Sequence, residues 1–160
     1  MSIDTAIQSF FISEQTPLSN QIFDLLSLSL YAIILVALVY LVYKKDKLNF
    51  TKFAIGILVV YAISEILKLF IGRMRPDLSA NESFPSRHAS LSFFVAGFLP
   101  VEKKYKILIY IWAILICISR LALNAHWFTD VLAGSIIGLA FAYLIEKAPL
   151  EKFFKRIHLQ

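Results

Sequence analysis

The sequence is poor in residues that mark several protein classes. It has one cysteine, five glycines and five prolines in 160 residues, which excludes an internal disulfide framework and a collagen-like repeat. Charged residues make up only 17% of the chain, against about 25% in ordinary globular proteins. A chain with so little charge and so few glycines and prolines also lacks the composition of a disordered protein.

Apolar residues are in excess. They form 59% of the chain, and the mean hydropathy is +0.72, whereas a soluble domain has about 45–50% apolar residues. A water-soluble protein of this length could not enclose so much apolar surface. We therefore expect an all-α integral membrane helical bundle, folded as a single domain over residues 1–160.

Five apolar segments are predicted to cross the membrane as helices. The first contains nineteen residues without a charge, close to the roughly 20 that span a hydrocarbon core. The third is short, because Pro100 follows after fourteen residues, a helix of about 21 Å. We expect it to cross while lying recessed, since only a crossing helix brings the motifs described below to one face. The predicted spans are residues 25–43, about 50–71, 86–99, 107–119 and about 127–145.

Both ends of the chain are predicted to lie along the membrane surface. Residues 1–13 contain no Lys or Arg, so we do not expect a cleaved leader. Apolar side chains recur there at helical spacing and predict an amphipathic helix that ends before Pro17. In residues 150–157 apolar side chains recur at helical spacing with basic side chains between them, which predicts a basic C-terminal interfacial helix. The N-terminal apolar stripe consists of Ile3, Ala6, Ile7, Phe10 and Phe11.

The distribution of basic residues predicts the orientation in the cell membrane. Eleven of the sixteen Lys and Arg residues fall in the first and third inter-helix segments and at the C-terminal end. Cytoplasmic loops are enriched in Lys and Arg. We therefore expect the N-terminus outside and the C-terminus in the cytoplasm. This placement explains the net charge of +5 without a nucleic-acid partner.

The predicted outer face nevertheless gathers ionisable residues at the ends of four helices. Such residues are costly near a membrane and usually mark a site, and several cations together suit an anionic ligand. The cations are Lys68, Arg73, Arg75, Arg87 and Arg120.

The spacing within each segment favours the same interpretation. Lys68 and Arg75 lie two helical turns apart, and Ser86 is a good N-cap with free backbone N–H groups after it. His126 and Asp130 lie four residues apart, so the carboxylate can accept from one ring nitrogen and orient the other as a base or nucleophile. Each pattern alone is more typical of a cap, a surface hydrogen bond or a membrane anchor. Their gathering on one face favours a site.

Three stretches resemble the motifs of the type 2 phosphatidic acid phosphatase superfamily, which includes lipid phosphatases and polyprenyl diphosphate phosphatases. They read KLFIGRMRP at 68–76, PSRH at 85–88 and SRLALNAHWFTD at 119–130. The order and spacing match, and the resemblance covers about residues 50–145. Arg87 stands where the pattern more often has glycine, which adds a cation and a bulky side chain beside the expected phosphate.

The resemblance implies a lipid phosphatase that needs no metal or other cofactor. It implies that His126 takes the phosphoryl group as a phosphohistidine, that Asp130 orients this ring, and that His88 protonates the leaving oxygen. This is coherent, because phosphoryl transfer requires mainly positioning and positive charge around the phosphate oxygens. The sequence shows no tight His, Cys and carboxylate cluster of the kind that binds a metal. The implied phosphate-binding residues are Lys68, Arg75, Ser86, Arg87 and Arg120.

The expected substrate is a lipid phosphate in the membrane. Residues 77–84 form a short loop that leaves little protein to recognise an elaborate headgroup. This favours a polyprenyl diphosphate, of the undecaprenyl or dolichyl type, hydrolysed to the monophosphate. Phosphatidate and phosphatidylglycerophosphate stay open as substrates. A non-catalytic lipid-binding relative is also open, although intact His88, His126 and Asp130 argue against it. The superfamily that the motifs resemble also includes vanadium haloperoxidases, and the five apolar spans exclude a soluble enzyme of that kind.

Overall fold

The structure is a computed structural model that describes residues 2–13 and 15–150. Within these residues the chain is all-α, as predicted, and contains six helices. The predicted basic C-terminal helix falls largely on residues outside the described part. The helices are α1 (Ile3–Ser13), α2 (Pro17–Tyr43), α3 (Lys47–Ile71), α4 (Arg87–Phe98), α5 (Lys103–Ala122) and α6 (Phe128–Lys147).

Local capping explains where the first long helices begin and end. Thr16 and Ser19 form a reciprocal capping box at the start of α2, with Pro17 as the first helical residue, a position where its missing N–H costs nothing. Pro17 therefore begins α2, while α1 ends at Ser13. Asp46 caps α3 by accepting from the Asn49 N–H at 3.0 Å, and Gly72 ends α3 in the left-handed conformation.

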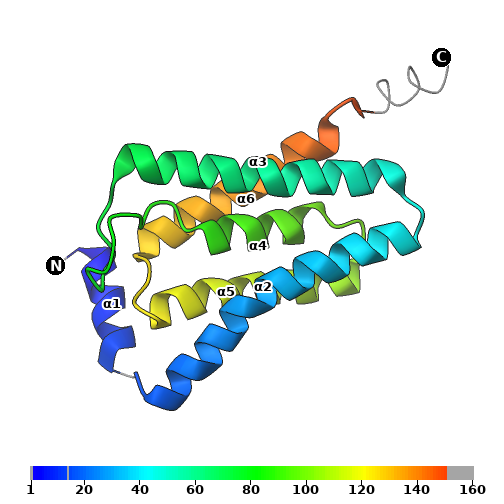
Figure 1. Cartoon of the computed structure of the whole chain (residues 1–160). Coiled ribbons are helices and arrows are strands. Elements are labelled where there is room, and N and C mark those ends of the chain that lie inside the picture. Colours follow the sequence, from blue (N-terminus) through cyan, green and yellow to red (C-terminus); the bar gives the residue numbers. More distant parts are fainter. Residues whose placement is uncertain (1, 14, 151–160) are drawn as a thin grey trace.

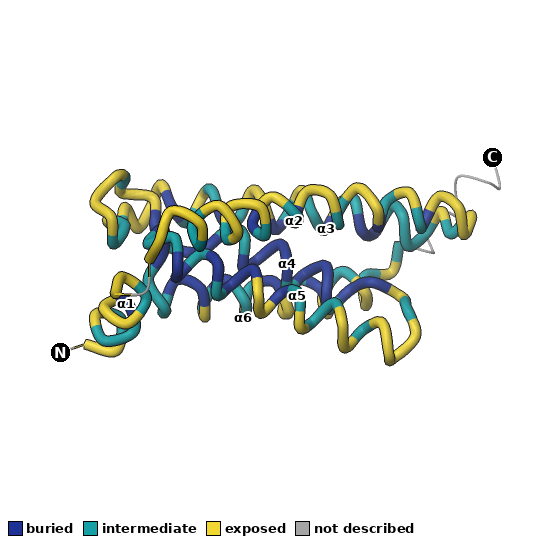
Figure 2. The backbone as a smooth tube through the Cα atoms, turned by 90° about the horizontal axis from the view of Figure 1, so that it is seen from below, coloured by how far each residue is buried: buried dark blue, intermediate teal, exposed yellow. Residues whose placement is uncertain are grey.

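Four helices are long and apolar enough to cross a membrane by length and composition: α2, α3, α5 and α6. Exposed positions recur along their length (Figure 2). Many of these positions carry large apolar side chains, which suits contact with lipid. The chain is a multi-pass membrane protein.

α4 is the short helix predicted at residues 86–99. It has twelve residues and is about 18 Å long, and eight of its residues are buried. It lies inside the bundle among the longer helices and runs opposite to α3 and α5 (Figures 1 and 2). The direction of the chain therefore alternates through α4, and the helix is recessed between the longer ones.

Small residues on α6 allow α4 to pack closely. A Cβ atom added at Gly134 would collide with the carbonyl oxygen of Ser86, and one at Gly138 would collide with that of Ser90. Two small residues four apart on one helix face are typical of close helix packing in membranes. The contact brings the start of α4 beside the start of α6, where the predicted motifs lie.

α1 is a helix, as predicted, but its buried face differs from the apolar stripe. Ile3 and Phe10 are exposed, whereas Gln8 is only 4% exposed, and Asp4 is paired with groups of the bundle. The reason is tertiary: α1 rests on polar groups of α5, α6 and the loop after α3, so polar side chains compete with the apolar ones for this contact.

Candidate active site

The three motif segments meet at one end of the bundle. The end of α3, the start of α4, the end of α5 and the start of α6 lie together beside α1 (Figure 1). The Ser86 N–H donates to the Asp130 carbonyl oxygen at 3.0 Å, which joins the second motif to the third. The Ser83 N–H donates to the Arg73 carbonyl oxygen at 2.9 Å, which closes the loop between the first two motifs.

Three buried donors at this end have no hydrogen-bond partner among the described residues: Arg75 Nε, Ser86 Oγ and Arg120 Nε. Ser86 occupies the N-cap position of α4 with its side chain fully buried, yet its hydroxyl caps no backbone N–H. Buried polar groups are almost always satisfied, and a helix N-terminus attracts anions. The arrangement fits an oxyanion such as phosphate.

Arg120 is held in place from α2. Its Nη1 donates to Ser27 Oγ at 3.0 Å, and the Ser27 hydroxyl also shares a 2.9 Å hydrogen bond with Ser119 Oγ. The sequence analysis missed Ser27, because a single serine in an apolar span carries no signal of its own.

Lys68 and Arg87 share one acceptor. Lys68, 5% exposed, lies 3.1 Å from Glu65 Oε1, and Arg87 Nη1 lies 3.0 Å from the same oxygen. The Arg87 guanidinium also stacks over the Tyr61 ring at 5.1 Å. The structure therefore pairs Arg87 with Glu65 of α3. Its contact with phosphate stays a prediction.

His126 lies in the α5–α6 loop and is 2% exposed. Its Nδ1 hydrogen-bonds the carbonyl oxygen of Ser83 at 2.7 Å. A carbonyl only accepts, so Nδ1 carries the proton and Nε2 keeps its lone pair. Asp130, the expected orienting partner, lies 3.9 Å from Nδ1, so Ser83 takes that direct role.

The surroundings of His126 favour its neutral form. Burial holds the pKa of His126 well below its usual range, because a charged ring is poorly solvated there. Nearby positive charges lower this pKa further, and they belong to Arg120, Arg75 and Lys68. The first and third motifs thus both contribute positive charge that favours the neutral imidazole.

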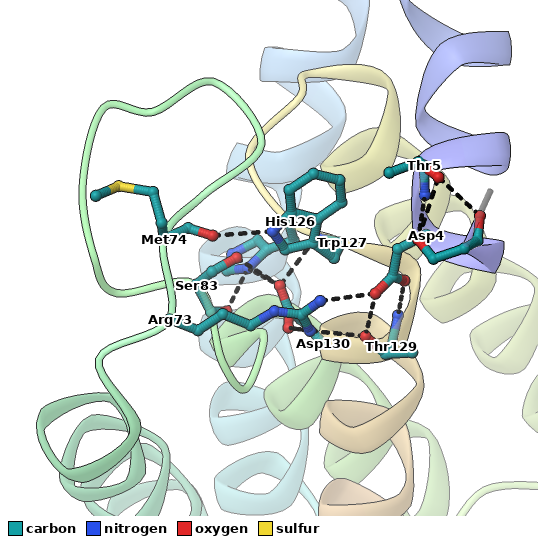
Figure 3. Close-up of polar contacts among 10 residues, drawn as sticks. Asp4, Thr5, Arg73, Met74, Ser83, His126, Trp127, Thr129 and Asp130 are labelled. Carbon is teal, nitrogen blue, oxygen red and sulfur yellow. Dashed lines mark hydrogen bonds and ion pairs between the residues drawn. The ribbon is translucent and has the colours of Figure 1, made fainter.

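Asp130 is fully buried and joins several polar groups (Figure 3). One carboxylate oxygen accepts from Arg73 Nη1 at 2.5 Å. The other accepts from the Trp127 N–H at 2.9 Å and from the Ser83 hydroxyl. Asp130 therefore fixes the segment that binds His126. Arg73, one of the cations of the predicted outer face, is the residue that pairs with Asp130.

His88 lies in the first turn of α4. Its ring packs edge-on against Tyr31 of α2, with 6.1 Å between ring centroids and 76° between planes. Residue 88 thus reaches the same end of the bundle as the other motif residues, while its role as a proton donor stays a prediction.

The polar groups do not form a metal-binding cluster in residues 2–13 and 15–150, where no three His, Cys, Asp or Glu side chains gather closely enough to hold an ion. Within the same residues, the charged groups with unpaired buried donors at the site are the side chains of Arg75 and Arg120.

Over the described residues, fold and site together define a helical membrane protein with buried, unpaired donors and several cations at one end of its bundle. The family model described as the PAP2 superfamily matches residues 49–153. The chain belongs to this superfamily, as its motifs suggested.

Individual relatives bear phosphatase names. Phosphatidylglycerophosphatase B of Bacillus subtilis (strain 168) is 34% identical over 101 residues, 52% of this chain and 50% of that protein. The chain spans half or less of the length of several curated relatives that it matches.

Two crystal structures share the fold. That of Aquifex aeolicus LpxE has a TM-score of 0.80 at 19% identity and covers 92% of this chain and 96% of that one. That of a PAP2 type phosphatidylglycerolphosphate phosphatase from Bacillus subtilis has a TM-score of 0.68 at 25% identity, with 96% and 85% covered.

Proposed function

We propose that this protein is a metal-independent lipid phosphatase that works through a phosphohistidine on His126. The observation that carries the proposal is the set of three buried donors without partners in the described part of the chain, Arg75 Nε, Ser86 Oγ and Arg120 Nε, at the same end of the bundle as an imidazole whose tautomer is fixed by Ser83. A tetrahedral phosphate satisfies the donors and presents phosphorus to Nε2.

In the first half-reaction, Nε2 of His126 forms a bond to phosphorus while the bond from phosphorus to the lipid oxygen breaks. The electron pair of the broken bond stays on the lipid oxygen, which takes a proton from His88. Cations and the α4 backbone N–H groups stabilise charge on the non-bridging oxygens. The side chains that contact these oxygens are the cations Lys68, Arg75 and Arg120 and the hydroxyl of Ser86.

In the second half-reaction, a water oxygen bonds to phosphorus and the bond from phosphorus to Nε2 breaks. His88, now neutral, takes the proton that the water loses. Inorganic phosphate leaves, and His126 returns to its neutral form with the proton on Nδ1. Asp130 and Ser83 hold the ring through both steps.

For the substrate we propose a polyprenyl diphosphate hydrolysed to the monophosphate. Arg87 supports this choice, because it follows Ser86 at the start of α4 and its guanidinium pairs with Glu65, whose carboxylate a second phosphate can replace. Phosphatidylglycerophosphate is the second candidate. It also carries two phosphates, and the name of the Bacillus subtilis relative favours it.

We propose that the site opens to the extracytoplasmic side, with the N-terminus outside. Support comes from the basic residues, which concentrate at the opposite end of the bundle in the α2–α3 and α4–α5 segments.

The test is phosphate release by detergent-solubilised protein in EDTA across a panel of lipids. The panel holds a polyprenyl diphosphate, phosphatidylglycerophosphate and phosphatidate. We expect release that His126→Gln abolishes, with the highest kcat/KM on the diphosphate. A preference for phosphatidylglycerophosphate would replace the first substrate by the second. No release from any lipid would favour a non-catalytic lipid-binding protein.

A further inference from the structure

α1 rests on the loop between α5 and α6. Gln8 donates to the Leu121 carbonyl oxygen at 3.3 Å and to the side chain of Asn124. Ile7 and Phe11 pack, partly buried, against the apolar cluster around Leu121. α1 therefore holds the end of α5 and the loop that follows it.

Asp4, one helical turn earlier, holds the other side of this loop. Its Oδ1 accepts from the Thr129 N–H at 2.9 Å, and its Oδ2 accepts from the Thr129 hydroxyl at 2.8 Å. Thr129 is the second residue of α6, so a carboxylate meets a helix N-terminus, where negative charge is stabilised. Asp4 Oδ2 also lies 2.6 Å from Arg73 Nη2.

Arg73 connects Asp4 to the interior of the site (Figure 3). Its Nη2 binds Asp4, and its Nη1 binds Asp130 at 2.5 Å. Asp130 accepts from the hydroxyl of Ser83, whose carbonyl oxygen orients His126. Arg73 is 31% exposed while Asp130 is fully buried, so the carboxylate at the surface end fixes a cation that the buried carboxylate requires.

We propose that Asp4 is a positioning residue for catalysis, which acts through Arg73 and Asp130 on the orientation of His126. α1 is then a part of the active-site structure as well as a helix at the membrane surface. The proposal rests on the proposed function in one respect, namely that His126 is the group to be oriented.

The burial of Asp4 separates this role from simple anchoring. Its side chain is 12% exposed, and an anchoring helix has no need to bury a charge. Burial raises the pKa of Asp4, but the hydrogen bonds from Thr129 and Arg73 outweigh it and hold the pKa below its usual value. Asp4 is therefore a carboxylate at neutral pH.

A double-mutant cycle on the full chain tests the coupling. Asp4→Asn keeps the shape of the side chain and removes its charge. We expect kcat to fall roughly 10- to 100-fold, the range found when a residue that orients a metal-ligating side chain is replaced. KM should stay within about twofold of wild type. Asp4→Glu should retain more of kcat. In an Arg73→Gln background, Asp4→Asn should lower kcat by less than about threefold, because the contact through which Asp4 acts on Asp130 is already absent. Ser9→Ala, exposed on the same helix, is the control.

Hydrogen exchange of residues 123–131 gives a readout without turnover. We expect faster exchange in Asp4→Asn than in Ser9→Ala, because the variant keeps one side-chain oxygen for the Thr129 N–H but loses the negative charge and the second acceptor that hold Thr129 and Arg73. If Asp4→Asn matches the control in both kcat and exchange, or if its effect on kcat is undiminished in the Arg73→Gln background, the proposal is wrong. If the wild-type protein releases no phosphate but exchange still responds, the proposed function fails while the coupling stands.

Discussion

Replacing Arg120 with lysine tests the anion site while keeping its charge. Arg120 reaches the site with one guanidinium nitrogen on Ser27 Oγ at 3.0 Å and with its Nε buried and without a partner. A planar guanidinium can grip phosphate with two nitrogens while a third stays anchored, whereas an ammonium is a point donor. Arg120→Lys therefore removes at least one charged hydrogen bond from the transition state.

The size of the loss follows from that bond. A hydrogen bond to a charged group contributes about 1.5–3 kcal/mol, and about 1.4 kcal/mol corresponds to tenfold in rate. We expect kcat/KM to fall roughly 10- to 150-fold. Ser27→Ala removes only the anchor and should cost less. Lys104→Gln, exposed at the opposite end of α5, should leave the rate unchanged.

The assay is phosphate release from a lipid phosphate in detergent, with the thermal unfolding midpoint measured in parallel. An Arg120→Lys variant with wild-type kcat/KM would refute the reasoning, because it would remove this side chain from the phosphate contacts. A loss of rate with an equal loss in Lys104→Gln would also refute it, since the effect would then be unrelated to the site.

Three further predictions concern sidedness, acid catalysis and pH. In a Cys117→Ser background, single cysteines at Ser79 and Glu102 should react with an impermeant thiol reagent from outside and inside respectively; reaction from one side only would mean that α4 does not cross. His88→Ala should lose more kcat/KM on a lipid monophosphate than on a diphosphate of the same chain, because the diphosphate's leaving group has a pKa near 6 and needs less protonation; equal losses would remove the acid role. Because the pKa of His126 is lowered, its protonation should reduce kcat/KM only below the ordinary histidine pKa of about 6.5, and an acid limb above that value would contradict a neutral buried nucleophile.

The helices and the meeting of the motifs follow from local patterns in the sequence. The length of each apolar segment sets the length of its helix, and Gly72 ends α3. Both features depend only on residues that are close together in the sequence. The alternating direction of the helices then places Lys68, Arg75, Arg120 and His126 at one end, whatever the details of packing.

The partners of the site residues could not be predicted in the same way. Ser83 lies 43 residues from His126, and Ser27 lies 93 residues from Arg120. Asp4 lies 125 residues from its partner Thr129. A single serine or aspartate carries no sequence pattern of its own. The Ser83 carbonyl oxygen lies 2.7 Å from His126 Nδ1 and Asp130 Oδ2 lies 3.9 Å from it, an order that the four-residue spacing of His126 and Asp130 could not reveal. Such contacts depend on the tertiary placement of loops.

Trapping the covalent intermediate tests the central claim most directly. Protein mixed with a lipid phosphate labelled on its terminal phosphate is quenched during turnover in EDTA, digested and mapped by mass spectrometry. We predict an alkali-stable, acid-labile phosphoryl group on His126 that is absent in His126→Gln. Turnover by the His126→Gln protein, or a phosphoryl group on a different side chain, would contradict the account.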